Sequence, residues 1–238
     1  MEIINYTSPF NKNISFDLAW DSTTFKPTAT SDFLIKAICE NTPETTEDVL
    51  DLGCGIGVVG IALLKHKIAM RLSASDLSAD AVSFTQHNCN LNDLEVDTRI
   101  SDIFSDWTNS KFDIIANDIS GIAEDVAKAS SWFDNVPSNS GPDGTDHVIK
   151  VIQQANNHLK KNGILYFPVI SLSNTNKIIE TARNEFETVT KLSSNSWFMP
   201  EALAHDIRFL EEQAAQFNID YDEKFGKVIC YTDIYSAQ

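Results

Sequence analysis

The sequence predicts a doubly wound α/β fold, in which helices cover both faces of a mostly parallel sheet. Three observations lead to this prediction. Apolar runs of strand length alternate with amphipathic helical patterns from residue 49 to residue 190. A glycine-rich turn at 53–57 joins one of these strands to the helix after it. No internal repeat or low-complexity linker interrupts this region, so we expect one main domain.

The first 29 residues differ from the rest, because prolines interrupt a mixed pattern that contains several large aromatic side chains. Residues 16–20 alternate between apolar and polar side chains as a short strand does. We predict that residues 1–29 form an extension packed on the main domain, which then occupies residues 30–238. A flexible tail is the alternative, and the aromatic content argues against it.

The elements of the main domain follow from periodicity and from end signals. A helix is predicted to run from Thr30 or Ser31, either of which can cap it, to about residue 40. A buried strand at 49–52 leads into the glycine turn and a helix to about residue 67. Further strands are predicted at 70–75, 96–100, 112–116 and 164–170, and further helices at 78–89, 123–129, 145–159 and 175–184. The cations and the glycine at 160–163 are typical of a helix end.

Two segments complete the chain in this interpretation. Prolines and glycines at 134–144 predict a loop. Two closing strands are predicted at 186–192 and 227–233, with an acid-rich insertion at 194–226 between them. That insertion contains one helical pattern from about residue 203 to residue 217.

The charge balance is strongly acidic, with 34 acids against 18 bases and a formal net charge of −16. Such a surface repels phosphate groups, so we expect extended nucleic acid and anionic membranes to be unlikely partners. A cationic ligand, a basic peptide or an uncharged small molecule suits this field better. No apolar stretch approaches the roughly 20 residues that span a bilayer.

Cysteine and histidine usage predicts no metal site. Neither residue type shows metal-ligand spacing. We expect Cys39, Cys54, Cys89 and Cys230 to be buried thiols in a reducing cytoplasm, since no secretory signal precedes the chain. Of the histidines, His147 lies beside the predicted loop and is the one best placed to touch a substrate.

Polar residues follow the first four strands of the alternating region at the point where each strand ends. They are Asp51, Asp76, Asp102 and the pair Asn117 and Asp118. In doubly wound sheets, ligands bind beyond the carboxyl ends of the strands, where the strand order reverses. The sequence therefore predicts a ligand site at this edge of the sheet.

Two cofactor classes compete for the glycine turn. Gly55, Gly57 and Gly60 match the dinucleotide fingerprint, and Asp76 lies near the distance expected of a partner for the ribose hydroxyls. The alternation starts earlier, however, as Asp-x-Gly-x-Gly-x-Gly from Asp51. A carboxylate at that position would crowd a pyrophosphate, but it suits an ammonium or sulfonium cation. The chain also has no second mononucleotide-binding half.

Residues 49–57 resemble motif I of the class I S-adenosylmethionine-dependent methyltransferases. The resemblance implies a Rossmann-like sheet of seven strands with the last strand antiparallel, and S-adenosylmethionine as the cofactor. Residues 160–165 are similar to the turn into the fifth strand of that family. The resemblance implies that the methionine part is held by Asp51, Gly53, Gly55 and Gly57, the ribose by Asp76 and Leu77, and the adenine by Asp102 and Ile103.

A finer resemblance involves residues 24–30 and 141–144, which are similar to the branch of release-factor glutamine and ribosomal-protein methyltransferases. Glutamine methyltransferases of that branch carry Asn-Pro-Pro-Tyr after the fourth strand. This chain has Asn117, Asp118, Ile119 and Ser120 there, so the asparagine alone is kept. The ribosomal-protein enzymes also lack the prolines, and a protein acceptor therefore stays open.

We expect Asn117 and Asp118 to face the methyl acceptor, with Asn117 also beside the cofactor. Asn117 can orient an acceptor through its amide, and Asp118 can take a proton from it or pair with its positive charge. The alternative for Asp118 is a cap for the helix near residue 123.

The predicted function is methyl transfer to a small molecule or to a protein or peptide. The alternatives are a nicotinamide-dependent oxidoreductase and a non-catalytic protein that binds the cofactor. The sequence specifies neither the acceptor atom nor the oligomeric state.

Overall fold

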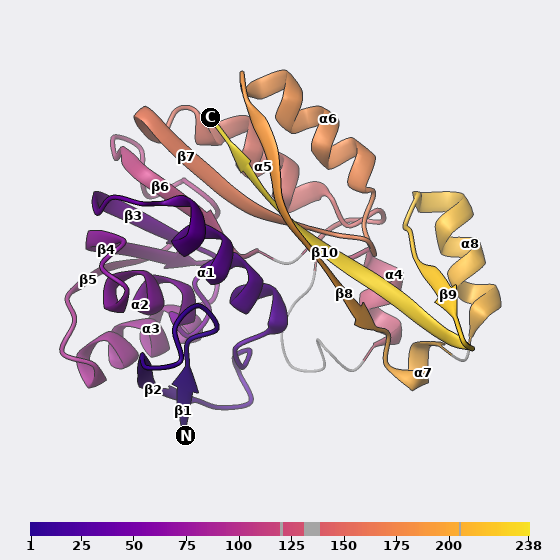
Figure 1. Ribbon diagram of the computed structural model, residues 1–238, viewed down its shortest axis with the longest axis horizontal. Helices are drawn as coiled ribbons and strands as arrows, with labels where there is room; N and C mark the ends of the chain where they lie inside the picture. The colour runs from indigo at the N-terminus through magenta and orange to yellow at the C-terminus, as the bar shows by residue number, and fades with distance from the viewer. Residues whose placement is uncertain (120, 131–138, 205) are drawn as a thin grey trace.

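The computed structural model describes residues 1–119, 121–130, 139–204 and 206–238. Ser120 and residues 134–138 of the predicted loop lie outside the described residues. The core is a sheet with the strand order β5-β4-β3-β6-β7-β10-β8, in which a short β9 also pairs with β10 (Figure 1). The strands are β3 (Thr46–Leu52), β4 (Ala69–Asp76), β5 (Val96–Ile100), β6 (Phe112–Asn117), β7 (Leu159–Ile170), β8 (Val189–Phe198), β9 (Asp222–Lys224) and β10 (Lys227–Ala237).

The direction of the strands confirms the predicted fold class. The five strands from β5 to β7 pair in parallel, whereas β10 is antiparallel to β7, β8 and β9. The strand order reverses between β3 and β6, so the carboxyl ends of these two strands flank a switch point.

Two apolar cores lie on opposite sides of the sheet. Val49 of β3 packs with residues of α1, α2 and α3, while Leu50 and Leu52 pack with residues of α5 and α6. This division follows from the strand itself, because successive side chains point to opposite faces. The helices are α1 (Ala29–Asn41), α2 (Val58–Lys65), α3 (Ala79–Leu91), α4 (Glu124–Ala129), α5 (Asp146–Ala155), α6 (Thr175–Glu185), α7 (Glu201–Ala204) and α8 (Ile207–Phe217).

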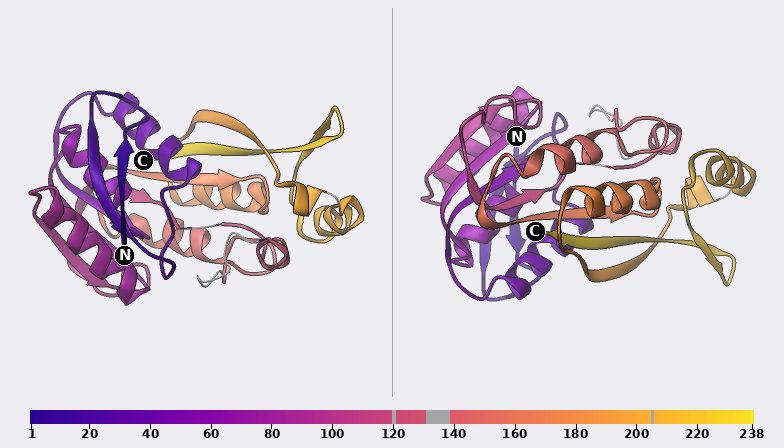
Figure 2. Two further views of the ribbon diagram at one scale, coloured as in Figure 1. Left: turned by 90° about the horizontal axis from the view of Figure 1, so that it is seen from below. Right: turned by 90° about the horizontal axis from the view of Figure 1, so that it is seen from above.

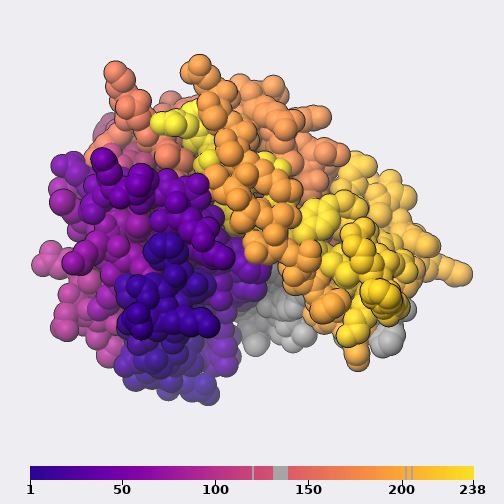
Figure 3. Space-filling view, viewed as in Figure 1, coloured from indigo at the N-terminus to yellow at the C-terminus, as the bar shows by residue number. Residues whose placement is uncertain are grey.

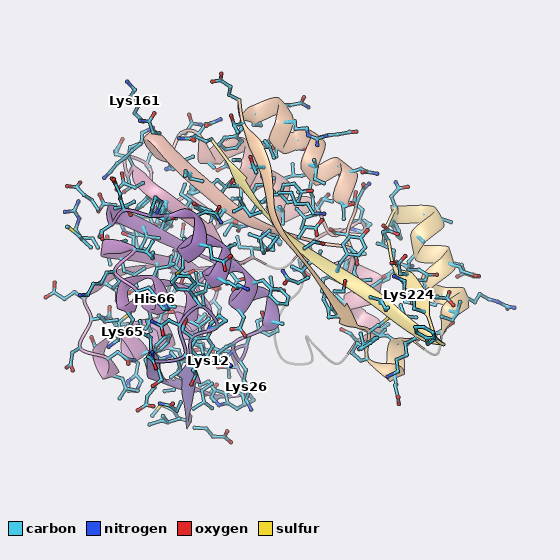
Figure 4. All side chains as sticks on the ribbon, in the orientation of Figure 1. Lys12, Lys26, Lys65, His66, Lys161 and Lys224 are labelled. Atoms are coloured by element: carbon cyan, nitrogen blue, oxygen red, sulfur yellow. The ribbon has the colours of Figure 1, made fainter. Side chains whose placement is uncertain are left out.

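A third apolar core lies where the ends of β8 and β10 extend away from the rest of the chain, together with α7, α8 and β9 (Figure 2). Leu210 of α8 packs there with Val126 of α4 and Cys230 of β10. Lys224 lies in this part of the molecule, whereas Lys12 and Lys26 lie apart from it, in the lower part of the view (Figure 4).

The N-terminal residues form an antiparallel hairpin of β1 (Glu2–Thr7) and β2 (Ser15–Trp20). Phe16 and Leu18 of the hairpin are buried in the same core as α1 and α2. In the space-filling view the indigo hairpin lies directly against the purple segments of the main sheet region (Figure 3). The division of the chain at residues 29 and 30, with an insertion at 194–226, stays a prediction.

Several predicted boundaries were wrong, each for a local reason. The cap of α1 is Thr28, whose side chain accepts a hydrogen bond from the Ser31 backbone N–H. Helix α5 ends at Ala155, so Leu159 and residues 160–163 belong to β7 instead of to a helix end. Asn162 has a φ of 66°, the left-handed conformation that asparagine tolerates, and the pairing of β6 with β7 shifts register between Phe112 and Ile114.

Two differences concern the C-terminal third. Phe186 ends α6 as its C-cap, and β8 therefore begins later than predicted, at Val189, and continues to Phe198. The helical pattern at 203–217 is divided between α7 and α8. The Asp206 side chain accepts a hydrogen bond from the Phe209 N–H and so caps a new helix where the pattern predicted a continuous one.

Candidate functional site

A cavity of about 560 Å³ opens beyond the carboxyl ends of β3, β4, β5 and β6. Seven of the predicted site residues line it, and they come from four consecutive strand ends. These seven are Gly53, Gly55, Asp76, Leu77, Asp102, Ile103 and Asp118. The structure thus brings most of the predicted residues together, whereas Asp51, Gly57 and Asn117 lie outside the lining.

The glycine turn is held against β4 and needs its glycines. The backbone N–H groups of Gly53 and Cys54 both donate to the Ser75 carbonyl, at 2.9 and 3.0 Å. Gly53 has a φ of 77°, and a Cβ at this position would lie 2.6 Å from Cγ1 of Ile119. Ile119 can therefore close over the turn only because residue 53 has no side chain.

Two polar side chains of α3 donate hydrogen bonds to backbone carbonyls of the same turn. Thr85 Oγ1 donates to the Gly55 carbonyl at 3.0 Å, and Asn88 Nδ2 donates to the Ile56 carbonyl at 2.9 Å. Sequence reasoning missed both residues. The signal was present, because Thr85 and Asn88 are polar side chains three residues apart on the buried face of an otherwise amphipathic helix.

Asp76 is fixed at the end of β4 by two backbone donors. Its Oδ2 accepts from the Gly55 N–H at 3.0 Å and its Oδ1 from the Ser78 N–H at 2.9 Å. Burial raises the pKa of Asp76, and these hydrogen bonds counteract the rise. The carboxyl group thus lies on the cavity wall in one orientation, next to Leu77, which is 67% exposed.

Asp102 and Ile103 line the cavity after β5, where the backbone turns sharply. Ile103 has a φ of 54°, and the Ser101 hydroxyl donates to its carbonyl at 2.9 Å. The Ser101 N–H in turn donates to the Asp76 carbonyl, so the ends of β4 and β5 are joined.

Asp51 lies beneath the glycine turn and not in the cavity. It is 1% exposed, and its Oδ2 accepts a hydrogen bond of 2.8 Å from the Gly60 N–H in the first turn of α2. Gly57, the N-cap of α2, has no side chain to do this, so Asp51 replaces the missing cap. Its Oδ1 is buried without a partner in the described part of the chain, and burial raises the pKa of Asp51 to about 8.

Asn117 and Asp118, though adjacent, have different surroundings. Asn117 is fully buried; its Oδ1 accepts a long hydrogen bond, 3.4 Å, from the Ile119 N–H. Asp118 lines the cavity, and its Oδ2 accepts a 2.6 Å hydrogen bond from the Ser31 hydroxyl of α1. Burial, with a smaller contribution from the charge of Asp32, raises the pKa of Asp118 to about 7. Asp118 is not a helix cap, because α4 begins after Ala123.

The rest of the cavity wall comes from segments far apart in the sequence. Residues 23–31, from the segment before α1 and its first turn, line one side, and Trp197 and Phe198 at the end of β8, with Pro200 after it, line another. Trp197 Nε1 donates to Thr232 Oγ1 at 3.1 Å, which holds the indole ring against β10. His147 of α5 also lines the cavity, and it is the histidine that the sequence placed nearest a substrate.

A cluster of acids at the other end of the strands is occupied by basic side chains. Glu47, Asp48 and Asp113 lie close enough to one another to hold a metal ion. Lys160 Nζ lies 2.7 Å from Asp48 and 2.9 Å from Asp113, and Arg71 also pairs with Asp48. These contacts identify the cluster as an ion-pair network that joins β3, β4, β6 and β7.

All four cysteines are free and buried, as predicted. Among the described residues, none of the helices is both long enough and apolar enough to cross a membrane.

Comparison with known proteins identifies relatives of this chain. The family model "Methyltransferase small domain" matches residues 26–118, from the segment before α1 to Asp118. A putative protein N5-glutamine methyltransferase from Methanocaldococcus jannaschii is 27% identical over 168 residues, which cover 71% of this chain and 78% of that protein. Ribosomal RNA small subunit methyltransferase C from Enterobacter is 45% identical over 74 residues, 31% of this chain and 21% of that protein.

Solved structures share the fold. The T. thermophilus 16S rRNA N2 G1207 methyltransferase, solved with AdoMet and guanosine, has a TM-score of 0.62 and 14% identity. The match covers all of this chain and 50% of that one. The ribosomal protein L11 methylase of Lactobacillus delbrueckii has a TM-score of 0.53 and 16% identity, over 88% of this chain and 80% of that one.

These relatives correct one expectation. The net charge led us to expect extended nucleic acid as an unlikely partner, and this was wrong, because several relatives of the chain are named as ribosomal RNA methyltransferases. Net charge is a sum over the whole surface, whereas nucleic-acid contacts are local. The match to this chain spans only 21% of the Enterobacter relative and 41% of the Haemophilus ducreyi one.

Proposed function

We propose that the chain is a class I S-adenosylmethionine-dependent methyltransferase, and that it methylates an acceptor bound beside Asp118. The observation that carries the proposal is the continuity of one cavity, whose wall includes Gly53, Asp76 and Ile103 as well as Asp118 and Trp197. A donor and an acceptor can therefore lie in contact without a wall between them. Such alignment is the main source of rate in a direct group transfer.

The residues that line the cavity fit S-adenosylmethionine. The Asp76 carboxyl, oriented by two backbone N–H groups, suits a pair of ribose hydroxyls. Leu77 and Ile103 offer apolar surface to the adenine, and Asp102 offers a hydrogen-bond acceptor. Nothing lies within 4 Å of a Cβ built on Gly55, so the turn leaves open space for the methionine part.

In this proposal the three predicted residues that do not line the cavity, Asp51, Gly57 and Asn117, support the residues that do. Asp51 caps α2. Gly57 leaves room for the Thr85 side chain, which would lie 3.1 Å from a Cβ on residue 57. Asn117 precedes Asp118, and its side chain accepts a hydrogen bond from the Ile119 N–H, which restrains the backbone on both sides of Asp118. Their contribution is to hold the glycine turn and the acceptor side at a constant separation.

Asp118 is the group that we assign to the acceptor. When bound, S-adenosylmethionine supplies an electrophilic methyl group on a sulfonium centre. Because Ser31 holds Oδ2 of Asp118, the carboxyl is oriented, and a pKa of about 7 lets it take up a proton near neutrality. A nitrogen acceptor loses a proton as it is methylated, and Asp118 can receive it.

The names of the relatives support a nitrogen acceptor. One is named for the N5 atom of glutamine, and the solved structure is named for N2 of a guanosine. Both atoms are planar nitrogens bonded to a carbon that carries a double bond. We therefore propose a planar nitrogen as the acceptor class, in ribosomal RNA or in a protein. The four buried thiols suit the reducing cytoplasm in which either acceptor is found.

Two measurements test the proposal. Calorimetry with S-adenosylmethionine, S-adenosylhomocysteine and NAD identifies the cofactor, and binding of NAD alone would overturn the assignment. Transfer from radiolabelled S-adenosylmethionine is then measured with 30S subunits, deproteinised 16S rRNA and total ribosomal protein as acceptors. Label in RNA or in protein selects the acceptor, whereas binding without transfer to any of these would favour the non-catalytic alternative.

A further inference from the structure

Asn88 of α3 contacts two parts of the molecule that are distant in sequence. Its side chain is fully buried and makes three hydrogen bonds. Nδ2 donates to the Ile56 carbonyl in the glycine turn at 2.9 Å, and also to the Ala19 carbonyl in β2 at 3.0 Å. Oδ1 accepts from the Ala19 N–H at 2.7 Å. The amide therefore joins the N-terminal hairpin to the turn that forms the cofactor side of the cavity.

Two neighbouring side chains, Thr85 of α3 and Asn92 at its C-cap, each bond to only one of these two segments. Thr85, one turn earlier, donates to Gly55 in the glycine turn. Asn92, one turn later, donates to the Asp17 carbonyl in the hairpin at 2.8 Å. Within the described residues, Asn88 is thus the one side chain of α3 that bonds to both segments.

From Ala19 the chain leads directly to the part of the cavity wall at 23–28. Trp20 follows, and Lys26 Nζ lies 3.9 Å from the centre of the Trp20 ring. Phe25 and Pro27, on either side of Lys26, line the cavity. At the far end of this segment, Thr28 caps α1. Residues 23–28 are therefore anchored at both ends, at β2 through Asn88 and at α1 through Thr28.

We propose that Asn88 is a positioning residue that couples cofactor binding at the glycine turn to the order of the cavity wall at 23–28. The proposal rests on the proposed function, because the ligand at the turn is the methyl donor or its demethylated product. A ligand that restrains Ile56 also restrains the Asn88 amide, whose hydrogen bonds are buried and cannot exchange with water. The restrained amide in turn restrains Ala19 and, through it, the start of the cavity wall at 23–28.

Hydrogen exchange of the full chain tests the coupling, with S-adenosylhomocysteine as the probe. In the wild type we expect the ligand to slow exchange at 53–58 and also at 19–28, the latter by about fivefold to tenfold. Asn88→Asp keeps the acceptor for the Ala19 N–H but removes both donated bonds. We expect it to retain protection at 53–58 and lose it at 19–28.

Two matched variants separate coupling from simple loosening. Thr85→Val removes two bonds to the turn, and Asn92→Ala removes one bond to the hairpin and one to the Asn88 backbone carbonyl. Neither side chain bonds to both segments, so both variants should keep the ligand-dependent protection at 19–28. Loss of that protection in all three variants, or its persistence in Asn88→Asp, would overturn the assignment of coupling to Asn88.

If Asn88→Asp does not fold, the same hydrogen-exchange measurement on Asn88→Ala and on the wild type tests the coupling. A wild type that binds S-adenosylhomocysteine and protects 53–58 but not 19–28 would contradict the coupling and leave the proposed function intact. A wild type that does not bind S-adenosylhomocysteine would overturn both.

Discussion

At the scale of single residues, three carboxyl groups near the cavity have distinct surroundings. Asp76 is oriented by two backbone donors, Asp118 by the Ser31 hydroxyl, and Asp51 by the Gly60 N–H beneath the turn. Burial raises the pKa of all three, to about 7 for Asp118 and about 8 for Asp51. Asp118 and Asp51 therefore hold a proton near neutral pH to a greater extent than exposed aspartates do.

Replacing Asp76 by alanine should weaken binding of S-adenosylhomocysteine. The substitution removes a carboxyl group assigned to the ribose hydroxyls, and hydrogen bonds to a charged group contribute roughly 1.5–3 kcal/mol. We expect a rise in the dissociation constant of about 10- to 100-fold by calorimetry. Asp80→Ala, at an exposed position in the first turn of α3, is the matched control and should bind as the wild type does. Equal affinity in both variants would remove Asp76 from the cofactor site.

The rate of methyl transfer should rise with pH through about 7, the pKa of Asp118. Below this pH the carboxyl is protonated and cannot receive a proton from the acceptor; above it the carboxylate can. The measurement is kcat/KM as a function of pH, with the acceptor identified by the labelling experiment. Asp118→Asn should reduce turnover and flatten the profile while it leaves affinity for S-adenosylhomocysteine intact. An unchanged profile in this variant would exclude Asp118 as the proton acceptor.

Asp51 should make the protein less stable as pH rises from about 4 to about 8. In the unfolded chain its carboxyl ionises near its ordinary pKa of 3.8, but in the folded protein it stays protonated up to about 8. The unfolded state then binds fewer protons in this interval, so the free energy of unfolding decreases with pH.

The matching substitution is Asp51→Asn, which keeps an oxygen for the Gly60 N–H and cannot ionise. Urea denaturation at several pH values should give a shallower decrease for the variant, by a few kcal/mol over the interval. Some slope should remain, because the raised pKa of Asp118 acts in the same direction. Parallel curves for the variant and the wild type would show that Asp51 is ionised in the folded protein.

At the scale of elements, the glycine turn is the junction between β3, β4, α2 and α3. Backbone bonds to Ser75 hold it on one side, and Thr85 and Asn88 hold it on the other. Ile119 covers it from the end of β6. The turn is thus fixed by three neighbouring elements rather than by its own residues alone.

Gly53→Ala should therefore destabilise the protein more than Gly55→Ala. Both positions have positive φ, at 77° and 53°, which costs an alanine about 1–2 kcal/mol. Only at Gly53 does the new Cβ overlap a neighbour, at 2.6 Å from Cγ1 of Ile119. Thermal unfolding of the two variants measures the difference. Equal melting temperatures would mean that Ile119 moves aside without cost.

At the scale of the whole molecule, the N-terminal hairpin is part of the main core. Phe16, Leu18 and Ala19 are buried, and Ser8 is hydrogen-bonded to Nε2 of His66 at the end of α2. The other end of the molecule differs, because the turn between β9 and β10 places Phe225 entirely in solvent.

Removal of residues 1–20 should consequently unfold the protein or leave it marginally stable. Burial of each large apolar side chain contributes about 1.5–3 kcal/mol, and total stabilities are only about 5–15 kcal/mol. Circular dichroism with thermal unfolding measures the loss. Phe225→Ala is the control and should melt as the wild type does. A truncated chain with wild-type stability would show that the hairpin is dispensable for folding.

The sequence alone predicted the alternation of strands and helices in the main domain and the edge of the sheet at which the cavity lies. Strand periodicity, the glycines at 53–57 and the acids at the strand ends are local features, and parallel strands bring their carboxyl ends to one edge whatever else the chain does. This is why Asp76, Asp102 and Asp118 line one cavity as expected. The family resemblance added the antiparallel final strand, which backbone pairing confirms.

Only the tertiary structure decided where individual side chains point and which distant segments meet. Residues 49–52 are all buried, so the sequence could not say which face Asp51 occupies; packing of α2 over that face turned it into a helix cap. The position of Asn88 on a helix was predictable, but its hydrogen bonds to Ala19, 69 residues away in sequence, depend on where the hairpin packs. Such contacts depend on loop paths and on the fit of whole surfaces, which no local pattern of residues encodes.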